Sequence, residues 1–188
     1  MPRYLVSGIA ELVSDVAAVL REHDVEVVEV HDIADVPRAC EEAGPSSLDG
    51  YVQLPATFTV QGDTAVERVH HFFADGVLAR FPAVQAALPA LAPGARLTFV
   101  TGVLPRDVST DDDVAARAAL IRILGHAARA DAATGLRVTV LGSGSSPKEI
   151  ALTVLGRGAE RGARTGELSD ESYAEWRMEL LGMMWAET

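Results

Sequence analysis

The sequence contains few cysteine, lysine and aromatic residues, and it has no long apolar run. It contains one cysteine, one lysine and three tyrosines, and aromatic residues make up 5% of its 188 positions. The single thiol, Cys40, cannot form an internal disulfide, which is consistent with a reducing, cytoplasmic location. No segment approaches 18 consecutive apolar residues, and no basic start precedes a long apolar run. Neither a membrane span nor a signal peptide is therefore expected.

Positive charge is also scarce. Asp and Glu number 27 against 16 Lys and Arg, which gives a formal net charge of −11. Nucleic acids and anionic membrane surfaces bind proteins that present a basic face, so neither is expected as a partner. The hydrophobic content of 48% is sufficient for one sizeable core.

What the sequence does contain is an alternation of strand and helix patterns. Strand patterns occupy residues 4–6, 25–30, 51–54, 97–100 and 136–141. Helical patterns occupy residues 9–22, 34–43, 65–91 and 112–130 and begin again near 147; Pro82 is expected to kink or split the third. This alternation predicts one Rossmann-like, doubly wound α/β domain over residues 1–188, with about five parallel strands and flanking helices. No strand is expected after residue 160, and residues 166–188 are predicted to form a C-terminal helical extension.

The first strand leads into an unusual turn. Ser7-Gly8 ends the strand, and the chain then enters a helix at once. Dinucleotide-binding units carry three glycines here, for the tight turn, for the approach of pyrophosphate and for helix–sheet packing. Gly8 is the only one of the three in this chain, because Leu12 and Ser14 occupy the later two positions.

Further segments follow the turn in a fixed order. Asp32 ends the second strand region, and Gln53 and Leu54 end the third strand pattern. Thr101-Gly102 follows the fourth, and an Arg-Ala-Ala-Leu segment begins at Arg117. In this order, residues 4–155 resemble the short-chain dehydrogenase/reductase family. Ser7-Gly8 is similar to the start of its Thr-Gly-x-x-x-Gly-x-Gly loop, and residues 49–56 to its strand ending in Asn-Asn-Ala-Gly. Residues 97–102 resemble the family's strand that carries the catalytic serine. Residues 117–120 resemble the Lys-Ala-Ala-Leu segment of its active-site helix, and residues 135–144 resemble the strand that follows that helix.

The resemblance implies a dinucleotide cofactor, held by Ser7 and Gly8 and by Asp32 at the ribose. The turn itself argues that no cofactor binds: Leu12 puts bulk at the pyrophosphate position, Ser14 adds a Cβ at the helix–sheet contact, and Glu11 would repel a diphosphate. NAD(P) binding stays open as the alternative, because a helix N-terminus still offers unpaired amides.

The catalytic pair of the family is missing. The resemblance implies a tyrosine four residues before a lysine, where the phenol transfers a proton and the ammonium lowers its pKa and holds the ribose. Asp113 and Arg117 occupy these two places, and no Tyr-x-x-x-Lys occurs in the chain. An ionised aspartate donates protons poorly and an arginine cannot be tuned to transfer them near neutrality, so standard hydride transfer is not expected.

Three further observations concern the sheet order, metal binding and the start of a helix. Only one short helix fits between the second strand and Tyr51, where the family has a further strand and helix, so the predicted sheet order is 2-1-3-4-5. No metal site is predicted, because the sequence around His70, His71 and His126 does not show the ligand spacing of a metal site. Ser146-Pro147-Lys148-Glu149 is typical of a helix capping box.

The C-terminal segment is the strongest interaction signal. Tyr173, Trp176, Leu180 and Met184 form one helical stripe of the kind enriched in interfaces; packing on the chain's own sheet is the alternative. Two hypotheses follow. The first is a non-catalytic binding or assembly subunit that associates with itself or with an active member of the family, with a small-molecule cleft as an option. The second is an atypical reductase, isomerase or cyclase that uses Asp113 as base and Thr101 or Arg117 to polarise a carbonyl.

Overall fold

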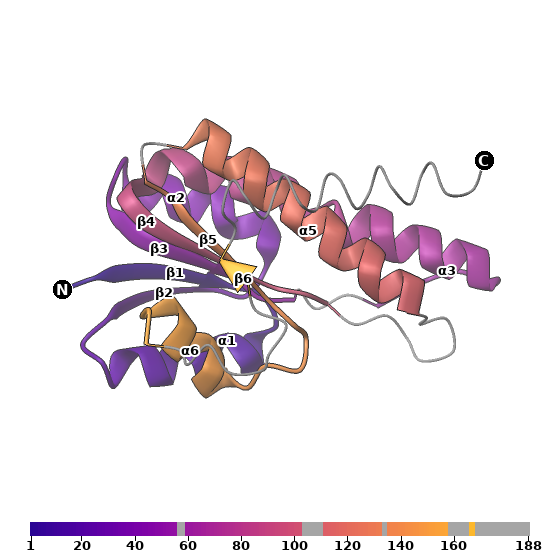
Figure 1. Cartoon of the computed structure of the whole chain (residues 1–188), viewed down its shortest axis with the longest axis horizontal. Coiled ribbons are helices and arrows are strands. Elements are labelled where there is room, and N and C mark those ends of the chain that lie inside the picture. The colour runs from indigo at the N-terminus through magenta and orange to yellow at the C-terminus, as the bar shows by residue number, and fades with distance from the viewer. Residues whose placement is uncertain (56–58, 103–110, 133–134, 158–165, 168–188) are drawn as a thin grey trace.

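A six-stranded sheet forms the centre of the protein (Figure 1). The computed structural model describes residues 1–55, 59–102, 111–132, 135–157 and 166–167. The strand order is β2-β1-β3-β4-β5-β6; the first five strands pair in parallel and β6 is antiparallel to β5. The strands are β1 (Arg3–Ser7), β2 (Glu26–Val30), β3 (Leu48–Gln53), β4 (Leu91–Val100), β5 (Arg137–Leu141) and β6 (Gly166–Glu167). The predicted fold class and the order 2-1-3-4-5 are confirmed.

Helices cover both faces of this sheet (Figure 1). On one face, α1 (Ala10–Arg21) packs against α6 (Pro147–Val154). The other face carries α2 (Val36–Ala43), which follows the short turn η1 (Ile33–Asp35), and then the π-helical turn η2 (Phe72–Val77), α4 (Arg80–Ala87) and α5 (Asp111–Asp131). In the described ranges, no helix is long and apolar enough to span a membrane.

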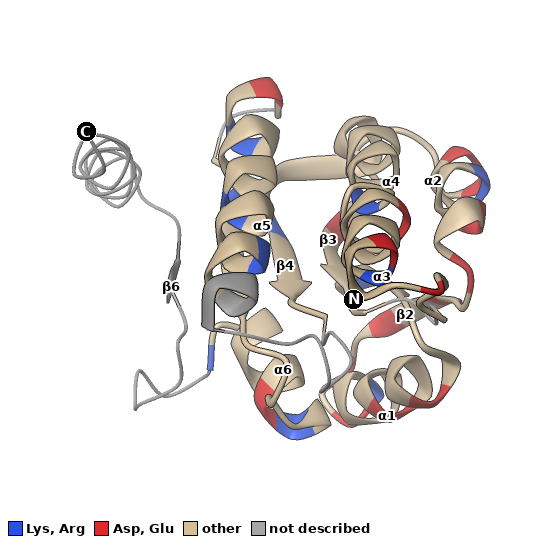
Figure 2. Cartoon of the chain, turned by 90° about the vertical axis from the view of Figure 1, so that its right-hand side faces the viewer, with Lys and Arg blue, Asp and Glu red and all other residues tan. Residues whose placement is uncertain are grey.

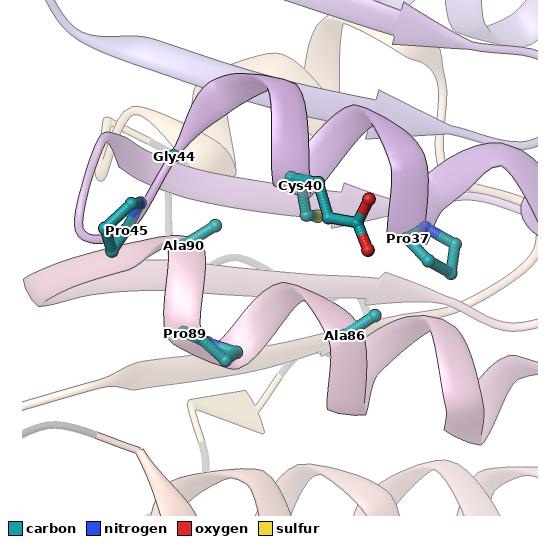
Figure 3. A pocket seen from close by; sticks show the side chains of 8 residues that line it. Pro37, Cys40, Gly44, Pro45, Ala86, Pro89 and Ala90 are labelled. Atoms are coloured by element: carbon teal, nitrogen blue, oxygen red, sulfur yellow. The ribbon is translucent and has the colours of Figure 1, made fainter.

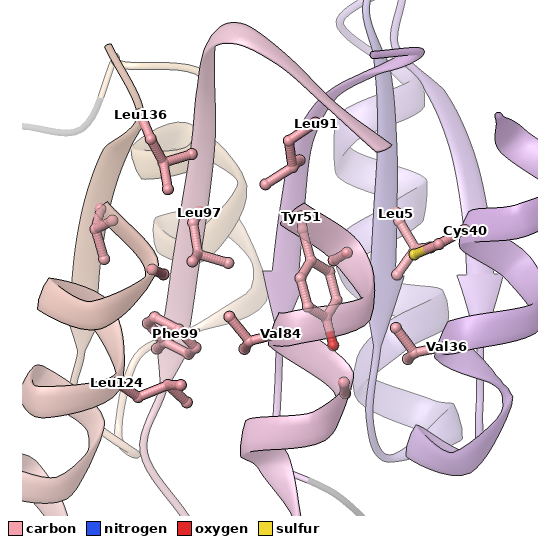
Figure 4. Packing of buried hydrophobic residues seen from close by; sticks show 14 of the residues in the cluster. Leu5, Val36, Cys40, Tyr51, Val84, Leu91, Leu97, Phe99, Leu124 and Leu136 are labelled. Atoms are coloured by element: carbon pink, nitrogen blue, oxygen red, sulfur yellow. The ribbon is translucent and has the colours of Figure 1, made fainter. Parts of the chain in front are cut away.

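The alternation of side chains along the central strands produces two apolar clusters. Leu5, Tyr51 and Phe99 point to the face under α2, α4 and α5 (Figure 4). Val6 and Val52, their neighbours in sequence, point to the opposite face under α1 and α6. Because successive side chains of a strand alternate in direction, the central strands are buried on both sides, as expected for a parallel sheet between two helical layers.

The helix predicted over residues 65–91 is divided into shorter helices. α3 (Ala65–His71) continues into η2, the chain turns at Leu78 and Ala79, and α4 is followed by η3 (Leu88–Ala90). Pro82 is the third residue of α4, in the first turn, where its missing N–H removes no intrahelical hydrogen bond. The predicted split at Pro82 is confirmed, and it lies on the N-terminal side of the proline.

The capping box before α6 is also confirmed. The Ser146 Oγ accepts a hydrogen bond from the Glu149 N–H at 3.3 Å, and the Glu149 carboxylate accepts one from the Ser146 N–H at 2.8 Å. Pro147 is the first helical residue, where the fixed φ of proline favours the helix.

The expectation that no strand follows residue 160 was wrong. Gly166 pairs with Val140 and Glu167 with Thr139, so β6 lies antiparallel to β5 at the end of the sheet. A strand of two residues is too short to produce an alternating pattern, which is why the sequence did not reveal it. The remainder of the predicted C-terminal extension, with Tyr173, Trp176, Leu180 and Met184, lies outside the described residues.

Candidate functional site

The carboxyl ends of β1, β3, β4 and β5 lie at one edge of the sheet, because these strands are parallel. Ligands of open α/β sheets bind at this edge. It receives the Ser7-Gly8 turn from β1, Leu54 after β3, and Thr101 after β4. This edge is therefore the candidate site, and its chemistry depends on how these segments contact one another.

The β1–α1 turn is closed by the segment that follows β3. The Ile9 N–H donates to the Pro55 carbonyl at 2.8 Å, and the Leu54 N–H donates to the Ser7 carbonyl at 2.8 Å. Gly8 has φ +140°, and a Cβ built on it would lie 2.7 Å from both the Leu54 Cβ and the Pro55 oxygen. The glycine is thus required by the contact between two segments of the protein itself.

The two positions that lack glycine take different places in the structure. Leu12 is half-buried and packs against the cluster under α1. Ser14 is exposed, and its Oγ donates to Glu29 at 3.2 Å. The expectation that Ser14 adds its Cβ to a buried helix–sheet contact was wrong, because Ser14 is exposed on α1 and its hydroxyl contacts the half-buried Glu29 of β2.

Asp32, the candidate ribose ligand, acts as a helix cap. Its Oδ1 accepts a hydrogen bond from the Ala34 N–H at 2.9 Å, at the start of η1. The residue is exposed. Glu29, three residues earlier on β2, forms an ion pair of 2.7 Å with Arg21. One carboxylate oxygen of Asp32 is therefore committed to the backbone.

A buried polar network lies beneath this edge of the sheet. Ser7 and Tyr51 share a hydrogen bond of 2.8 Å between their hydroxyls, and the Gln53 Nε2 donates to the Tyr51 hydroxyl at 3.1 Å. Arg80 donates from Nε to the Gln53 Oε1 at 2.9 Å and from Nη2 to the Gln53 carbonyl at 2.8 Å. Gln53 returns a bond of 3.1 Å to the Arg80 carbonyl. The network joins β1, β3 and α4 through partners 44 and 27 residues apart.

Burial sets the protonation of this network. Ser7, Tyr51 and Gln53 are fully buried, and Arg80 is 3% exposed. Burial raises the pKa of Tyr51 to about 12, although its hydrogen bonds to Ser7 and Gln53 oppose that shift. Burial also lowers the pKa of Arg80 to about 10. Near neutrality the phenol is protonated and the guanidinium is charged, so neither group is adapted to proton transfer there.

The resemblance places the lysine of the catalytic pair at Arg117, and this residue lies against an aromatic ring. Arg117 is buried, and its guanidinium carbon is 5.9 Å from the centroid of Phe72, within cation–π range. A Cβ on Gly102 would lie 3.9 Å from the Phe72 Cζ. The Thr101 N–H donates to the Leu141 carbonyl at 3.0 Å. The structure thus brings Arg117 and Gly102 close to Phe72, and Thr101 is hydrogen-bonded to Leu141 of β5. The side chain of Asp113 lies outside the described part.

A groove of about 340 Å³ lies elsewhere, between α2 and the α4–η3 segment (Figure 3). Cys40 and Glu41 come from α2, and Pro89 and Ala90 from η3. Burial raises the pKa of the Cys40 thiol to about 11. No residue predicted from the sequence as catalytic or cofactor-binding lines this groove.

The described residues hold no cluster of three or more His, Cys, Asp or Glu that could bind a metal ion. His71 lies 3.5 Å from Asp75 on the next helical turn, which is an ion pair only when the imidazole is protonated.

The sheet and its two helical layers define a Rossmann-like α/β fold. Two solved structures show it at low identity. BdcA (YjgI) from E. coli aligns with a TM-score of 0.54 and 16% identity over 85% of this chain and 90% of its own. A protein from Burkholderia multivorans, designated a short-chain alcohol dehydrogenase, aligns with a TM-score of 0.56 and 13% identity over 82% and 89%. No protein-family model and no curated protein sequence matches the chain.

Proposed function

We propose that this protein is a binding or assembly subunit with a dehydrogenase-like fold, which does not carry out NAD(P)-dependent hydride transfer. Its partner is a second copy of itself or an active short-chain dehydrogenase/reductase subunit, in the cytoplasm. The single observation that carries the proposal is the closure of the β1–α1 turn by Leu54 and Pro55.

The residues at this turn fit a dinucleotide poorly. The Ile9 N–H, the first amide after the glycine, is already paired with the Pro55 carbonyl at 2.8 Å. A pyrophosphate would have to displace that bond and accommodate Leu12 where backbone approach requires glycine. Asp32 spends one oxygen on the Ala34 amide. These contacts support a turn that is maintained for packing.

The absent catalytic pair supports the same proposal. The place of the ammonium is taken by the Arg117 guanidinium, 5.9 Å from the Phe72 centroid, and the place of the phenol by Asp113, so no tyrosine stands there to transfer a proton. The hydroxyl of the buried Tyr51 is bonded to Ser7 and Gln53.

The test combines two measurements on the full chain. Calorimetric titration with NADH and NADPH is expected to show no binding in the micromolar range, and light scattering is expected to show a particle larger than one chain. Micromolar binding of either nucleotide would overturn the non-catalytic role. A monomer at high concentration, alone and with a dehydrogenase partner, would overturn the assembly role.

An atypical enzyme is the second candidate, favoured by the approach of Arg117 and Gly102, the residue after Thr101, to the same ring of Phe72. In this alternative, Asp113 serves as base, and Arg117 or Thr101 polarises a carbonyl. It predicts turnover of a carbonyl substrate that is lost in Asp113→Asn and retained in Tyr51→Phe.

A further inference from the structure

The outer face of α5 is apolar and open to solvent. Ala116, Ala119, Ile123 and Ala127 follow one another at i, i+3, i+7 and i+11, which places them on one side of a helix. Ala116 and Ala127 are exposed, Ala119 is half-buried, and Ile123 is 40% exposed. A single exposed isoleucine is ordinary on a protein surface, so this face indicates a binding surface only together with a complementary segment.

The C-terminal segment matches it in spacing and in size. Tyr173, Trp176, Leu180 and Met184 also follow one another at i, i+3, i+7 and i+11. The segment begins after β6, which pairs with β5, and α5 packs over β5. Small residues on one helix allow large ones on another to approach closely, so a mainly alanine face suits an aromatic and methionine stripe.

Charge matches as well. Arg122 directly precedes Ile123 on α5. Figure 2 shows basic residues along this helix, whereas α1 and α2 carry many acidic residues. In the segment, Glu179 directly precedes Leu180, and its other charged residues are mainly acidic. Equivalent flanks of two helices meet when the helices pack antiparallel, which would bring Arg122 and Glu179 together.

We propose that the outer face of α5, defined by Ala116, Ala119, Ile123 and Ala127, binds the C-terminal stripe of a second copy of this chain. This inference rests on the proposed function and names the surface through which the subunit associates with itself. Reciprocal exchange gives a two-fold dimer with two identical contacts. Each stripe would bury roughly 700 Å², with aromatic side chains supplying about 150–250 Å² each. Two stripes therefore reach roughly 1,400 Å² before α5 is counted, which is the size of a stable interface.

The experiment measures the dimer dissociation constant of the full chain by sedimentation. Ile123→Glu and Trp176→Ala are each expected to raise it at least about thirtyfold, the effect of losing one central interface residue. Val66→Glu is the matched control, because Val66 is an apolar residue 79% exposed on α3. It is expected to leave the constant unchanged. Circular dichroism and the urea midpoint establish that each variant is folded.

A charge exchange tests the pairing directly. Arg122→Glu is expected to weaken the dimer, and Glu179→Arg in the same chain is expected to restore most of the affinity. If Trp176→Ala dissociates the dimer and Ile123→Glu does not, the receiving surface is wrong although self-association stands. If the wild-type chain is a monomer whose stripe shields Ile123, the contact is intramolecular and the second copy is wrong. Nucleotide binding by the wild-type chain would instead overturn the proposed function and leave the contact standing.

Discussion

Replacing Gly8 by alanine tests whether the β1–α1 turn is held by protein contacts. At φ +140° this position is accessible almost only to glycine, and an added Cβ would lie 2.7 Å from two atoms of Leu54 and Pro55. Backbone strain of this kind costs about 1–3 kcal/mol. Overpacking against the end of β3 adds about 1–3 kcal/mol. We expect Gly8→Ala to lower the free energy of unfolding by about 2–5 kcal/mol, after a small gain from the stiffer unfolded chain.

Two other glycines separate these contributions. Gly94 has φ +77° and no atom within 4 Å of an added Cβ, so Gly94→Ala measures backbone strain alone, about 1–2 kcal/mol. Gly142 has open space and no positive φ, and Gly142→Ala is expected to lie within about 0.5 kcal/mol of wild type.

The assay is urea unfolding of the three variants, monitored by circular dichroism. The free energies of unfolding are compared where the slope m is the same for each variant. The expected order of destabilisation is Gly8, then Gly94, then Gly142. A Gly8→Ala variant no less stable than Gly94→Ala would refute the reasoning, because the turn would then have room for a side chain, and therefore for a ligand.

Four further results are expected. Gln53→Leu leaves the Arg80 guanidinium without its side-chain acceptor and should lower the free energy of unfolding by about 2–4 kcal/mol. The double variant with Arg80→Leu should recover part of that loss, and additive losses in urea unfolding would contradict the network. Cys40, whose pKa is raised to about 11, should resist alkylation at pH 8, and its alkylation rate should rise about tenfold per pH unit up to pH 11. Because the folded thiol keeps its proton to higher pH than the unfolded one, Cys40 contributes stability that is lost between pH 9 and 11. Leu12→Gly combined with Ser14→Gly should not create NADH binding in calorimetry, because the Ile9 amide stays paired with Pro55. Hydrogen bonds from Ser146 lower the pKa of Glu149, so the cap should stabilise α6 above pH 4.5 and weaken as acid protonates the carboxylate; a Glu149→Gln variant with unchanged acid unfolding would count against it.

The parts of the fold that sequence predicts well are those with a local physical cause. Strands β1, β3 and β4 contain apolar runs and α1 carries one apolar side, so periodicity predicts that these elements exist. The sheet order 2-1-3-4-5 followed from the resemblance to the family. The capping box at Ser146 and the break before Pro82 also depend on neighbouring residues. β6 has two residues and no pattern, and it was missed.

The candidate site was only partly predictable, because its contacts join distant segments. Nothing local indicates that Tyr51 meets Ser7 or that Arg80 reaches Gln53. One signal was available: Ser7 and Gln53 stand at matching places at the ends of adjacent apolar strands, and Arg80 is a lone cation among apolar residues of its helix. A buried cation needs acceptors, and a polar strand end is where they can be found.

These contacts change how the missing glycines are interpreted. A cofactor at this sheet edge would require free backbone groups and open space. Here the Ile9 N–H donates to the Pro55 carbonyl, and the Ser7 hydroxyl is hydrogen-bonded to the Tyr51 hydroxyl. A single glycine replaced in an otherwise open loop would leave those groups available to a ligand. Here each is satisfied by the protein, and satisfied groups offer a ligand no net hydrogen-bond gain on displacement. The sequence changes at the turn and at the catalytic pair are therefore consistent with one cause, a Rossmann-like fold retained for its surfaces.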